Sequence, residues 1–354
     1  MRILFLTHSF NSLAQRLYLE LTRKGHEVSI EFDIHHEITE QAISLFAPNL
    51  ILAPYLKRPI PASVWTKIPC FIVHPGIRGD RGPSSLDWAI LSQETEWGVT
   101  ILQANQEMDS GDIWAEEFFT MRNVHKSSLY RNEVTQAAVK AVLSAVEKFC
   151  TKSYRPGPLN YNDPKTRGRP KPLMTQSDRK INWVQDTTQD IVRKLNSADG
   201  HPGILSTVLE KNVYLFNGIS AGEFASGTCI PGSVMSWNKN GILLATSDGA
   251  IWVTHLCEKS SAHFKLPAAR VLQSNLAKIR EGQGPNPIRF SQKKCVGILE
   301  FDFYNGAMST EQCLELRTAV IEALKTDIRV LVLLGSEDFW SNGIHLHVIE
   351  AAEN

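Results

Sequence analysis

Residues 70–90 read CFIVHPGIRGDRGPSSLDWAI and predict a strand, a loop and a helix in direct succession. The apolar run from Cys70 to Val73 is typical of a buried strand, and it leads straight into His74 and a loop rich in glycine and arginine. A helix should follow, with Ser84 as its N-cap and Asp87 as the capping-box partner. A histidine at the end of such a strand lies where open α/β sheets bind their ligands.

The chain on both sides of this stretch alternates short apolar strands with helical patterns, over about residues 1–150. The expected strands are RILFLTH (2–8), EVSIEFD (27–33), NLILAPYL (49–56) and GVTILQA (98–104). Residues 11–25 place Leu13, Leu17 and Leu21 on one helical face, with Asn11 or Ser12 as N-cap, and residues 127–149 predict a long closing helix. This alternation predicts an α/β domain with a mostly parallel, Rossmann-like sheet covered on both faces.

Three further regions follow. Residues 151–178 contain five prolines and several basic residues, which predicts an extended linker rather than a nucleic-acid or phosphate patch. Residues 179–287 carry one helical pattern and then short strands separated by turns, which predicts a small OB-like β-barrel. Residues 294–354 predict a strand, a helix and a second strand. About sixty residues cannot close a covered α/β layer alone, so this region either packs on the earlier domains or, as we favour, begins a longer domain.

Composition excludes several classes of function. Among 354 residues, 37 Lys and Arg balance 37 Asp and Glu, so no overall charge favours nucleic acid or an anionic membrane. No apolar stretch approaches the length of a membrane span, and MRILFLTHSF is expected to form a first strand rather than a signal peptide. The six cysteines form no CxxC pair, which favours reduced thiols in a cytoplasmic protein over disulfides or a zinc site.

His74 and Asp109 are the candidate catalytic pair, because each follows one of two neighbouring predicted strands. An imidazole can stabilise a developing oxyanion while a carboxylate orients it or relays a proton through water. The alternative is a histidine that bonds a turn, beside an ordinary Asp-x-Gly turn at Gly111. The loop GIRGDRGP (76–83) is equally open: Arg78 and Arg81 could bind phosphate, or the glycines only prepare the next helix.

The motifs HPGIRGDRGPSSLDWAI (74–90) and WGVTILQANQEMDSGDIW (97–114) resemble the formyltransferases that use 10-formyltetrahydrofolate. The His-Pro motif, the Arg-Gly loop, the Gly-Val-Thr strand and the Asp-x-Gly turn occur in the family's order and near its spacing, and the resemblance covers about residues 1–150. It implies that His74 and Asp109 are catalytic. YLKRPIPASV (55–64) resembles the loop that binds the pterin ring. The implied folate-binding residues are Lys57, Arg58, Pro59, Gly76, Asn105, Glu107 and Asp109.

Two positions depart from that family. Ile72 occupies the place of a catalytic asparagine, two residues before His74, and losing one oxyanion donor typically costs about 2.7–4 kcal/mol. The site is then slow, uses another donor, or serves a nucleophile that needs less help, such as a thiol. The first loop, THSFNSLAQ (7–15), lacks the glycines that hold a ribonucleotide phosphate, which argues against glycinamide ribonucleotide as the substrate.

The later regions carry two more resemblances. The segment RKINWVQDTTQDIVRKL (179–195) resembles the start of the barrel-like C-terminal domain of methionyl-tRNA formyltransferases. YNGAMS (304–309) and WSNGIHL (340–346) resemble the start of the enoyl-CoA hydratase/isomerase, or crotonase, fold. That likeness implies an oxyanion-type donor at Asn342, followed by Gly343. The family's acid is His345 here, so hydratase chemistry is not implied. No metal site is expected, because His345 and His347 are two apart and lack a third ligand.

A folate formyltransferase fused to a crotonase resembles the HypX (HoxX) family of hydrogenase maturation proteins. The resemblance implies 10-formyltetrahydrofolate and coenzyme A as small-molecule substrates, and formyl-CoA as the first step towards CO for [NiFe]-hydrogenase. It implies the missing crotonase remainder and hydrogenase maturation proteins as partners, and neither nucleic acid nor membrane. The alternatives are formyl transfer to an amine, on an aminosugar nucleotide or aminoacyl-tRNA, and a folate- or CoA-binding module without catalysis.

Overall fold

The computed structural model describes residues 1–151, 153–222, 229–260 and 264–352. The chain divides into two compact units, Met1–Thr175 and Gln176–Asn354. The division lies inside the proline-rich segment 151–178. Within the described ranges, no helix combines the length and the apolar character that crossing a bilayer requires.

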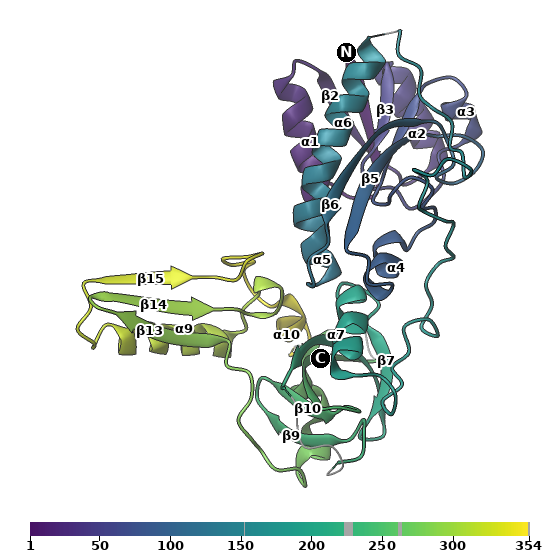
Figure 1. The fold of residues 1–354 in the computed structure, drawn as a ribbon. Helices are drawn as coiled ribbons and strands as arrows, with labels where there is room; N and C mark the ends of the chain where they lie inside the picture. The colour runs from purple at the N-terminus through teal and green to yellow at the C-terminus, as the bar shows by residue number, and fades with distance from the viewer. Residues whose placement is uncertain (152, 223–228, 261–263, 353–354) are drawn as a thin grey trace. The chain divides into compact units, whose positions relative to one another are not determined.

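The first unit is built on a six-stranded sheet with the order β2-β1-β3-β4-β5-β6 (Figure 1). The strands are β1 (Arg2–Thr7), β2 (Glu27–Phe32), β3 (Leu50–Ala53), β4 (Cys70–His74), β5 (Glu96–Gln103) and β6 (Ile113–Thr120). The first four are parallel, whereas β5 is antiparallel to β4 and β6 is antiparallel to β5. The expected mostly parallel sheet is confirmed. Sequence reasoning missed β6, because IWAEEFFT does not alternate cleanly between apolar and polar residues.

Helices cover both faces of this sheet. They are α1 (Ser12–Arg23), α2 (His36–Phe46), α3 (Ala62–Trp65), α4 (Ser85–Leu91), α5 (Lys126–Leu129), a π-helical turn (Tyr130–Val134) and α6 (Thr135–Cys150). On one face, Leu17 of α1 and Ala141 of α6 share a core with Phe5 of β1. On the other face, Leu6 of β1 belongs to a second core with Val64 of α3. Because side chains alternate along a strand, β1 contributes to both cores.

Polar side chains at two helix ends test the predicted caps. Asn11 caps α1, since its Oδ1 accepts a hydrogen bond from the Ala14 amide at 3.0 Å. The capping box expected between Ser84 and Asp87 is wrong. Ser84 Oγ instead accepts from the amide of Met174 at 3.1 Å, and Asp87 pairs with Lys126 at 2.9 Å. Tertiary partners thus replace the local cap.

The second unit begins with an antiparallel sheet of order β7-β8-β11-β10-β9, which fits the expected OB-like domain. Its strands are β7 (Ile204–Val208), β8 (Lys211–Ser220), β9 (Val234–Asn238), β10 (Gly241–Ala245) and β11 (Ala250–Glu258), and the short β12 (Leu266–Pro267) pairs with β11. Two helices, α7 (Thr188–Ser197) and α8 (Ala268–Leu272), and a 3₁₀ turn (Gln273–Leu276) accompany them. Ile191 of α7 and Leu272 of α8 are buried in the same core as Val253 of β11.

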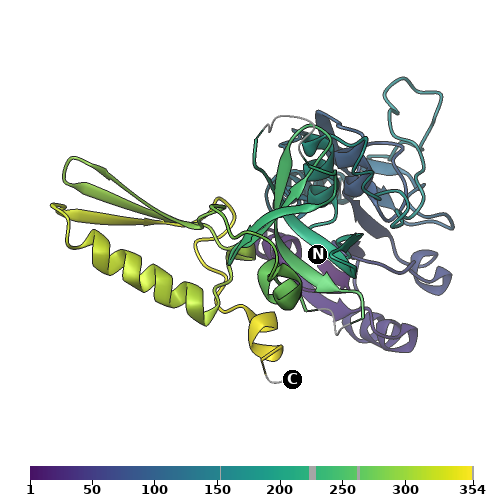
Figure 2. The same cartoon turned by 90° about the horizontal axis from the view of Figure 1, so that it is seen from below.

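The last part of this unit contains the predicted strand–helix–strand motif. Its elements are β13 (Ile288–Lys293), β14 (Val296–Phe301), a 3₁₀ turn (Tyr304–Gly306), α9 (Thr310–Ala323), β15 (Val330–Leu334) and α10 (Leu346–Glu350). β14 and β15 are parallel, and α9 lies along one face of the three-stranded sheet (Figure 2). Large apolar side chains remain exposed, among them Leu314 at 54%, Leu334 at 49% and Trp340 at 61%.

Candidate active site

His74, the last residue of β4, lies between two carboxylates. Its Nε2 is 2.8 Å from Asp80 Oδ2, and its Nδ1 is 3.5 Å from Asp109 Oδ2. The side chains of His74 and Asp80 are 5% and 3% exposed, whereas that of Asp109 is 12% exposed. Sequence reasoning selected His74 and Asp109 but missed Asp80. No periodic pattern shows that a residue in a glycine-rich loop turns back onto the preceding strand.

Asp109 reaches the histidine because the loop after β5 reverses direction. β5 is antiparallel to β4, so its last residue, Gln103, pairs with Phe71 near the start of β4. The return is close at Gly111, where a Cβ would lie 1.7 Å from the carbonyl oxygen of Gln103. Asp109 has a φ of 51°, which is uncommon for a residue other than glycine, and its Oδ2 accepts a hydrogen bond from the Gly82 amide at 3.2 Å. Backbone strain of this kind clusters at functional sites.

The two carboxylates set the protonation of His74. Burial alone lowers the pKa of an imidazole, because the charged ring loses its hydration. The charge of Asp109, then the hydrogen bond and charge of Asp80, act in the opposite direction and outweigh burial, so the pKa of His74 is raised above its ordinary value. The ring is therefore a doubly protonated, positively charged donor up to a higher pH than a free histidine.

Ile72 lies on the same side of β4 as His74, because residues two apart in a strand point to one face. It is half-buried and packs against the core that contains Leu6 and Cys70. A hydrocarbon has no donor. A carbonyl oxygen bound on this side of the strand therefore receives no hydrogen bond from the side chain at position 72.

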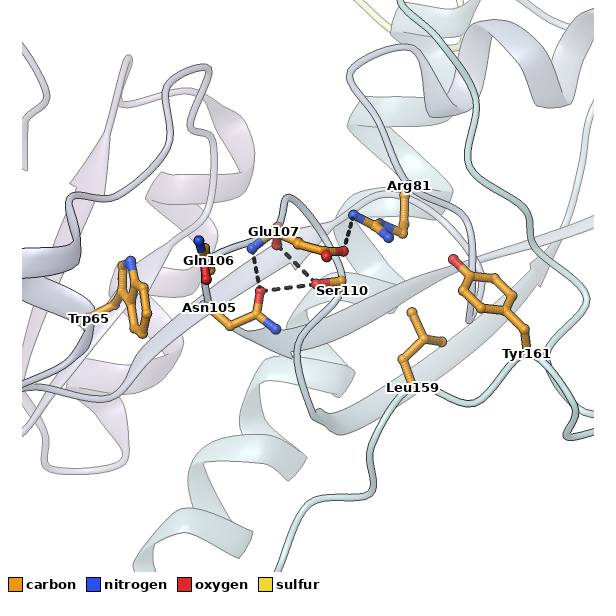
Figure 3. Close-up of a pocket in the computed structure, with 8 residues that line it drawn as sticks. All are labelled: Trp65, Arg81, Asn105, Gln106, Glu107, Ser110, Leu159 and Tyr161. Atoms are coloured by element: carbon orange, nitrogen blue, oxygen red, sulfur yellow. Dashed lines mark hydrogen bonds and ion pairs between the residues drawn. The ribbon is translucent and has the colours of Figure 1, made fainter.

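A cavity of about 500 Å³ opens beside the Asp109 loop (Figure 3). It is lined by Trp65, Arg81, Asn105, Gln106, Glu107, Ser110, Leu159 and Tyr161. This volume is typical of a small-molecule site. Asn105 and Glu107 were expected to bind the folate, and Arg81 belongs to the loop considered for phosphate binding. Trp65 and Tyr161 were not foreseen, because they come from segments far apart in the sequence.

Hydrogen bonds brace the polar wall of this cavity. Asn105 Oδ1 accepts from the Glu107 amide at 2.9 Å and from Ser110 Oγ at 3.0 Å. Arg81 Nη2 is 3.2 Å from Glu107 Oε2 (Figure 3). Arg81 Nε donates to the Met108 carbonyl at 2.7 Å. Arg81 thus holds the segment that contains Asp109.

The other expected folate-binding residues lie away from this cavity wall. The Lys57 amide donates to His8 Nδ1 at 3.2 Å, and Arg58 Nε is 2.9 Å from Asp33 Oδ2, which ties the loop after β3 to the end of β2. Pro59 is exposed on the same loop. Gly76 is in contact with the His74–Asp80 pair instead of lining the cavity.

In the crotonase-like segment, the predicted oxyanion donor, the backbone amide of Asn342, is hydrogen-bonded within the protein. The Asn342 amide donates to the Gly306 carbonyl at 2.7 Å, and the Gly343 carbonyl accepts from the Met308 amide at 2.9 Å. The ring of His345 is buried and stacks 5.6 Å from that of His255. Among the described residues, no group of three or more His, Cys, Asp and Glu side chains is arranged to hold a metal ion.

Comparisons of sequence identify relatives of two kinds. A family model described as the formyl transferase C-terminal domain matches residues 173–268. The hydrogenase maturation factor HoxX of Bradyrhizobium diazoefficiens is 47% identical over 356 residues, an alignment that covers 100% of this chain and 62% of HoxX. A methionyl-tRNA formyltransferase of Desulfotalea psychrophila is 22% identical over 219 residues, 61% of this chain and 66% of that enzyme.

Comparison of structures finds relatives of the same two kinds, HypX and methionyl-tRNA formyltransferases. HypX from Aquifex aeolicus in complex with tetrahydrofolic acid is 44% identical and superposes with a TM-score of 0.91, covering 100% of this chain and 63% of that one. Methionyl-tRNA formyltransferase from Clostridium thermocellum, at 16% identity and a TM-score of 0.51, covers 62% of this chain and shares its fold. The chain spans just over three fifths of the length of the HoxX and HypX chains that it matches.

Proposed function

We propose that this chain, which is related along its whole length to HypX and HoxX, transfers a formyl group from 10-formyltetrahydrofolate to an acceptor. The observation that carries the proposal is the buried His74, held between Asp80 and Asp109, together with a cavity of about 500 Å³ that is lined by Glu107 and Ser110 from the loop of Asp109. The matched formyl transferase C-terminal domain supports it, as does the HypX structure with tetrahydrofolic acid.

The charges around His74 suit acyl transfer. A nucleophile attacks the formyl carbon, the carbonyl oxygen becomes an oxyanion, and the protonated ring of His74 stabilises that charge. The bond between the formyl carbon and N10 of the folate then breaks. The proton that the nucleophile loses passes through water to Asp109, the more exposed carboxylate, and from there to N10, so that tetrahydrofolate leaves as a neutral amine.

Coenzyme A is the acceptor that the residues favour, and its product would be formyl-CoA. A thiol is a strong nucleophile, so it depends less on the amide donor that Ile72 removes. The segment after residue 294 resembles crotonases, which bind acyl-CoA thioesters. In this proposal formyl-CoA is the first intermediate towards CO for [NiFe]-hydrogenase, in keeping with the name of HoxX as a hydrogenase maturation factor.

Release of CO would need more than residues 294–354. The relatives are longer than this chain, and apolar side chains such as Leu334 and Trp340 are exposed on the crotonase-like segment. We propose that the remainder of a crotonase-like domain covers them and completes the oxyanion site at Asn342 and Gly343, where the Asn342 amide must exchange its hydrogen bond to the Gly306 carbonyl for one to the thioester oxygen. Hydrogenase maturation proteins are the further candidate partners. The six free cysteines favour the cytoplasm.

Two alternatives compete with transfer to coenzyme A. Transfer to an amine, on an aminosugar nucleotide or an aminoacyl-tRNA, fits the methionyl-tRNA formyltransferase relatives but not Ile72 or the crotonase-like segment. A binding module for folate or coenzyme A without catalysis fits the loss of the amide donor at Ile72.

Release of tetrahydrofolate from 10-formyltetrahydrofolate, measured with coenzyme A and separately with amines, tests these possibilities. We expect release with coenzyme A only, and a loss of about a hundredfold or more in His74→Ala and in Asp109→Ala. His36→Ala and Asp112→Ala, at exposed residues, serve as controls. Full activity in both site variants would show that the assignment is wrong, and folate binding without turnover would favour the binding module.

A further inference from the structure

We propose that Asp80 is a positioning residue for formyl transfer, which holds the His74 ring with Nδ1 towards Asp109 and supplies the negative charge that balances the ring. This inference rests on the proposed function. It gives Asp80 a role distinct from that of Asp109, and it identifies what compensates for the hydrocarbon at Ile72.

The distances and exposures of the two carboxylates separate their roles. Asp80 Oδ2 makes a 2.8 Å hydrogen bond to Nε2, and its side chain is only 3% exposed. Asp109 Oδ2 is 3.5 Å from Nδ1, beyond a good hydrogen bond, and its side chain is 12% exposed beside residues that line the cavity. Asp80 is therefore suited to orient and balance the ring, whereas Asp109 can exchange protons with water.

The loop from Pro75 to Asp80 is built to bring this carboxylate back to the histidine. A Cβ on Gly76 would lie 2.3 Å from Asp80 Oδ2 and 2.4 Å from His74 Nε2, so any larger residue would occupy the space between them. The Asp80 amide donates to the Ile77 carbonyl at 2.9 Å, which closes the turn.

Side chains from neighbouring elements hold the same loop from outside. The Pro75 carbonyl accepts from Ser85 Oγ at 2.7 Å and from Trp97 Nε1 at 3.0 Å. The Gly76 carbonyl accepts from Thr100 Oγ1 at 2.8 Å. With its backbone bonded on both sides, the loop fixes where the Asp80 carboxylate lies, and so fixes the ring.

No cation of this loop competes with the histidine for Asp80. The charged groups that act on His74 are Asp80, from the loop after β4, and Asp109, from the loop after β5. Arg78 Nε bonds Glu116 Oε2 at 2.7 Å, and Arg81 bonds Met108 and Glu107. The imidazolium is therefore the cation that the buried Asp80 carboxylate contacts, and a charge-assisted hydrogen bond of this kind is roughly twice as strong as a neutral one.

The test compares the 354-residue chain with its Asp80→Asn variant, which keeps the shape and removes the charge. Nitrogen-15 NMR of the His74 ring, assigned with His74→Ala, gives the pH at which the ring loses its proton. We expect this midpoint to fall in Asp80→Asn, and tetrahydrofolate release to fall about tenfold or more between the two measured midpoints and much less at a pH below both. Asp163→Asn removes a carboxylate that pairs with Arg78 and should change neither readout.

An unchanged NMR midpoint in Asp80→Asn, or an equal loss of rate at every pH, would overturn the proposal. If that variant does not fold, the wild-type titration alone decides, because a midpoint at or below 6.5, the ordinary value, also overturns it. The titration needs no turnover. If the wild type transfers no formyl group but the midpoint shift is found, the proposed function fails and the pairing of Asp80 with His74 stands.

Discussion

Replacing Gly76 with alanine should force Asp80 away from His74. The added methyl group would lie 2.3 Å from Asp80 Oδ2 and 2.4 Å from His74 Nε2, closer than any real Cβ contact. Gly76 is not among the glycines with a left-handed backbone, so alanine fits its φ and acts only as a wedge. Because the carbonyls of Pro75 and Gly76 are bonded to side chains on neighbouring elements, the loop cannot easily move aside.

The expected loss is about 3 kcal/mol in the free energy of unfolding of the first unit near pH 6. One charge-assisted hydrogen bond contributes about 1.5–3 kcal/mol, and a buried carboxylate left without its partner adds to the cost. A group whose pKa is raised by folding contributes stability below its unfolded pKa and loses it as the pH rises through its folded pKa. The pKa of His74 is raised, so the difference between wild type and variant should shrink towards pH 9.

Hydrogen exchange of peptides from β4 and α1 measures this effect in the first unit alone. A loss of about 3 kcal/mol corresponds to roughly a hundredfold faster exchange at pH 6. Gly157→Ala is the matched control, because no atom lies within 4 Å of its added Cβ and its φ is not left-handed. If Gly76→Ala shows the same hydrogen-exchange rates and the same rate of tetrahydrofolate release as Gly157→Ala, the tight contact between Asp80 and His74 does not exist in solution.

Three further outcomes follow from the site. Ile72→Asn should raise the rate of formyl transfer to an amine by up to about a hundredfold, because it places a side-chain amide on the His74 side of β4. Steady-state rates with coenzyme A and with an amine measure this effect. An unchanged rate with the amine would contradict it. Arg81→Ala should raise the KM for 10-formyltetrahydrofolate by about tenfold with a smaller change in kcat, because it removes the bonds to Glu107 and Met108. Initial rates over a range of folate concentrations measure this effect. A fall in kcat alone would contradict the prediction. The wild-type rate should begin to fall at a higher pH than an ordinary histidine would allow, because the pKa of His74 is raised. A decline with a midpoint below 6.5 would contradict this.

Local pattern was enough to predict the part of the fold that carries His74. The apolar run Cys70–Val73 lies in β4, and Leu13, Leu17 and Leu21 of α1 are buried as their spacing indicates. Asn11 caps α1 as expected, since its bond is to an amide three residues away. Where the partner is distant, the pattern failed: Ser84 bonds Met174 rather than its own helix.

The site needed information that local pattern does not contain. Asp80 depends on a turn at Gly76 that reverses the chain, and a carboxylate in such a loop normally indicates only a solvated surface. The cavity is lined both by Trp65, the last residue of α3, and by Tyr161 of the proline-rich segment, which sequence reasoning took for a linker. The direction of β5 was also not foreseen, and it makes the loop containing Asp109 fold back over the sheet.

The two carboxylates explain how a site can lose an amide and keep an oxyanion donor. A neutral asparagine donates without a counter-charge, whereas a buried imidazolium donates more strongly but is stable only beside an anion. Asp109 and Asp80 both supply that charge, and Asp80 is too buried to serve as the base as well. In the proposed reaction, proton transfer therefore falls to Asp109, the more exposed carboxylate, whose neighbour Ser110 lines the cavity. In the proposed reaction one charge lies on each side of the ring, so that Ile72 needs only to exclude water from the face where the oxyanion would form. A hydrocarbon does this better than an amide.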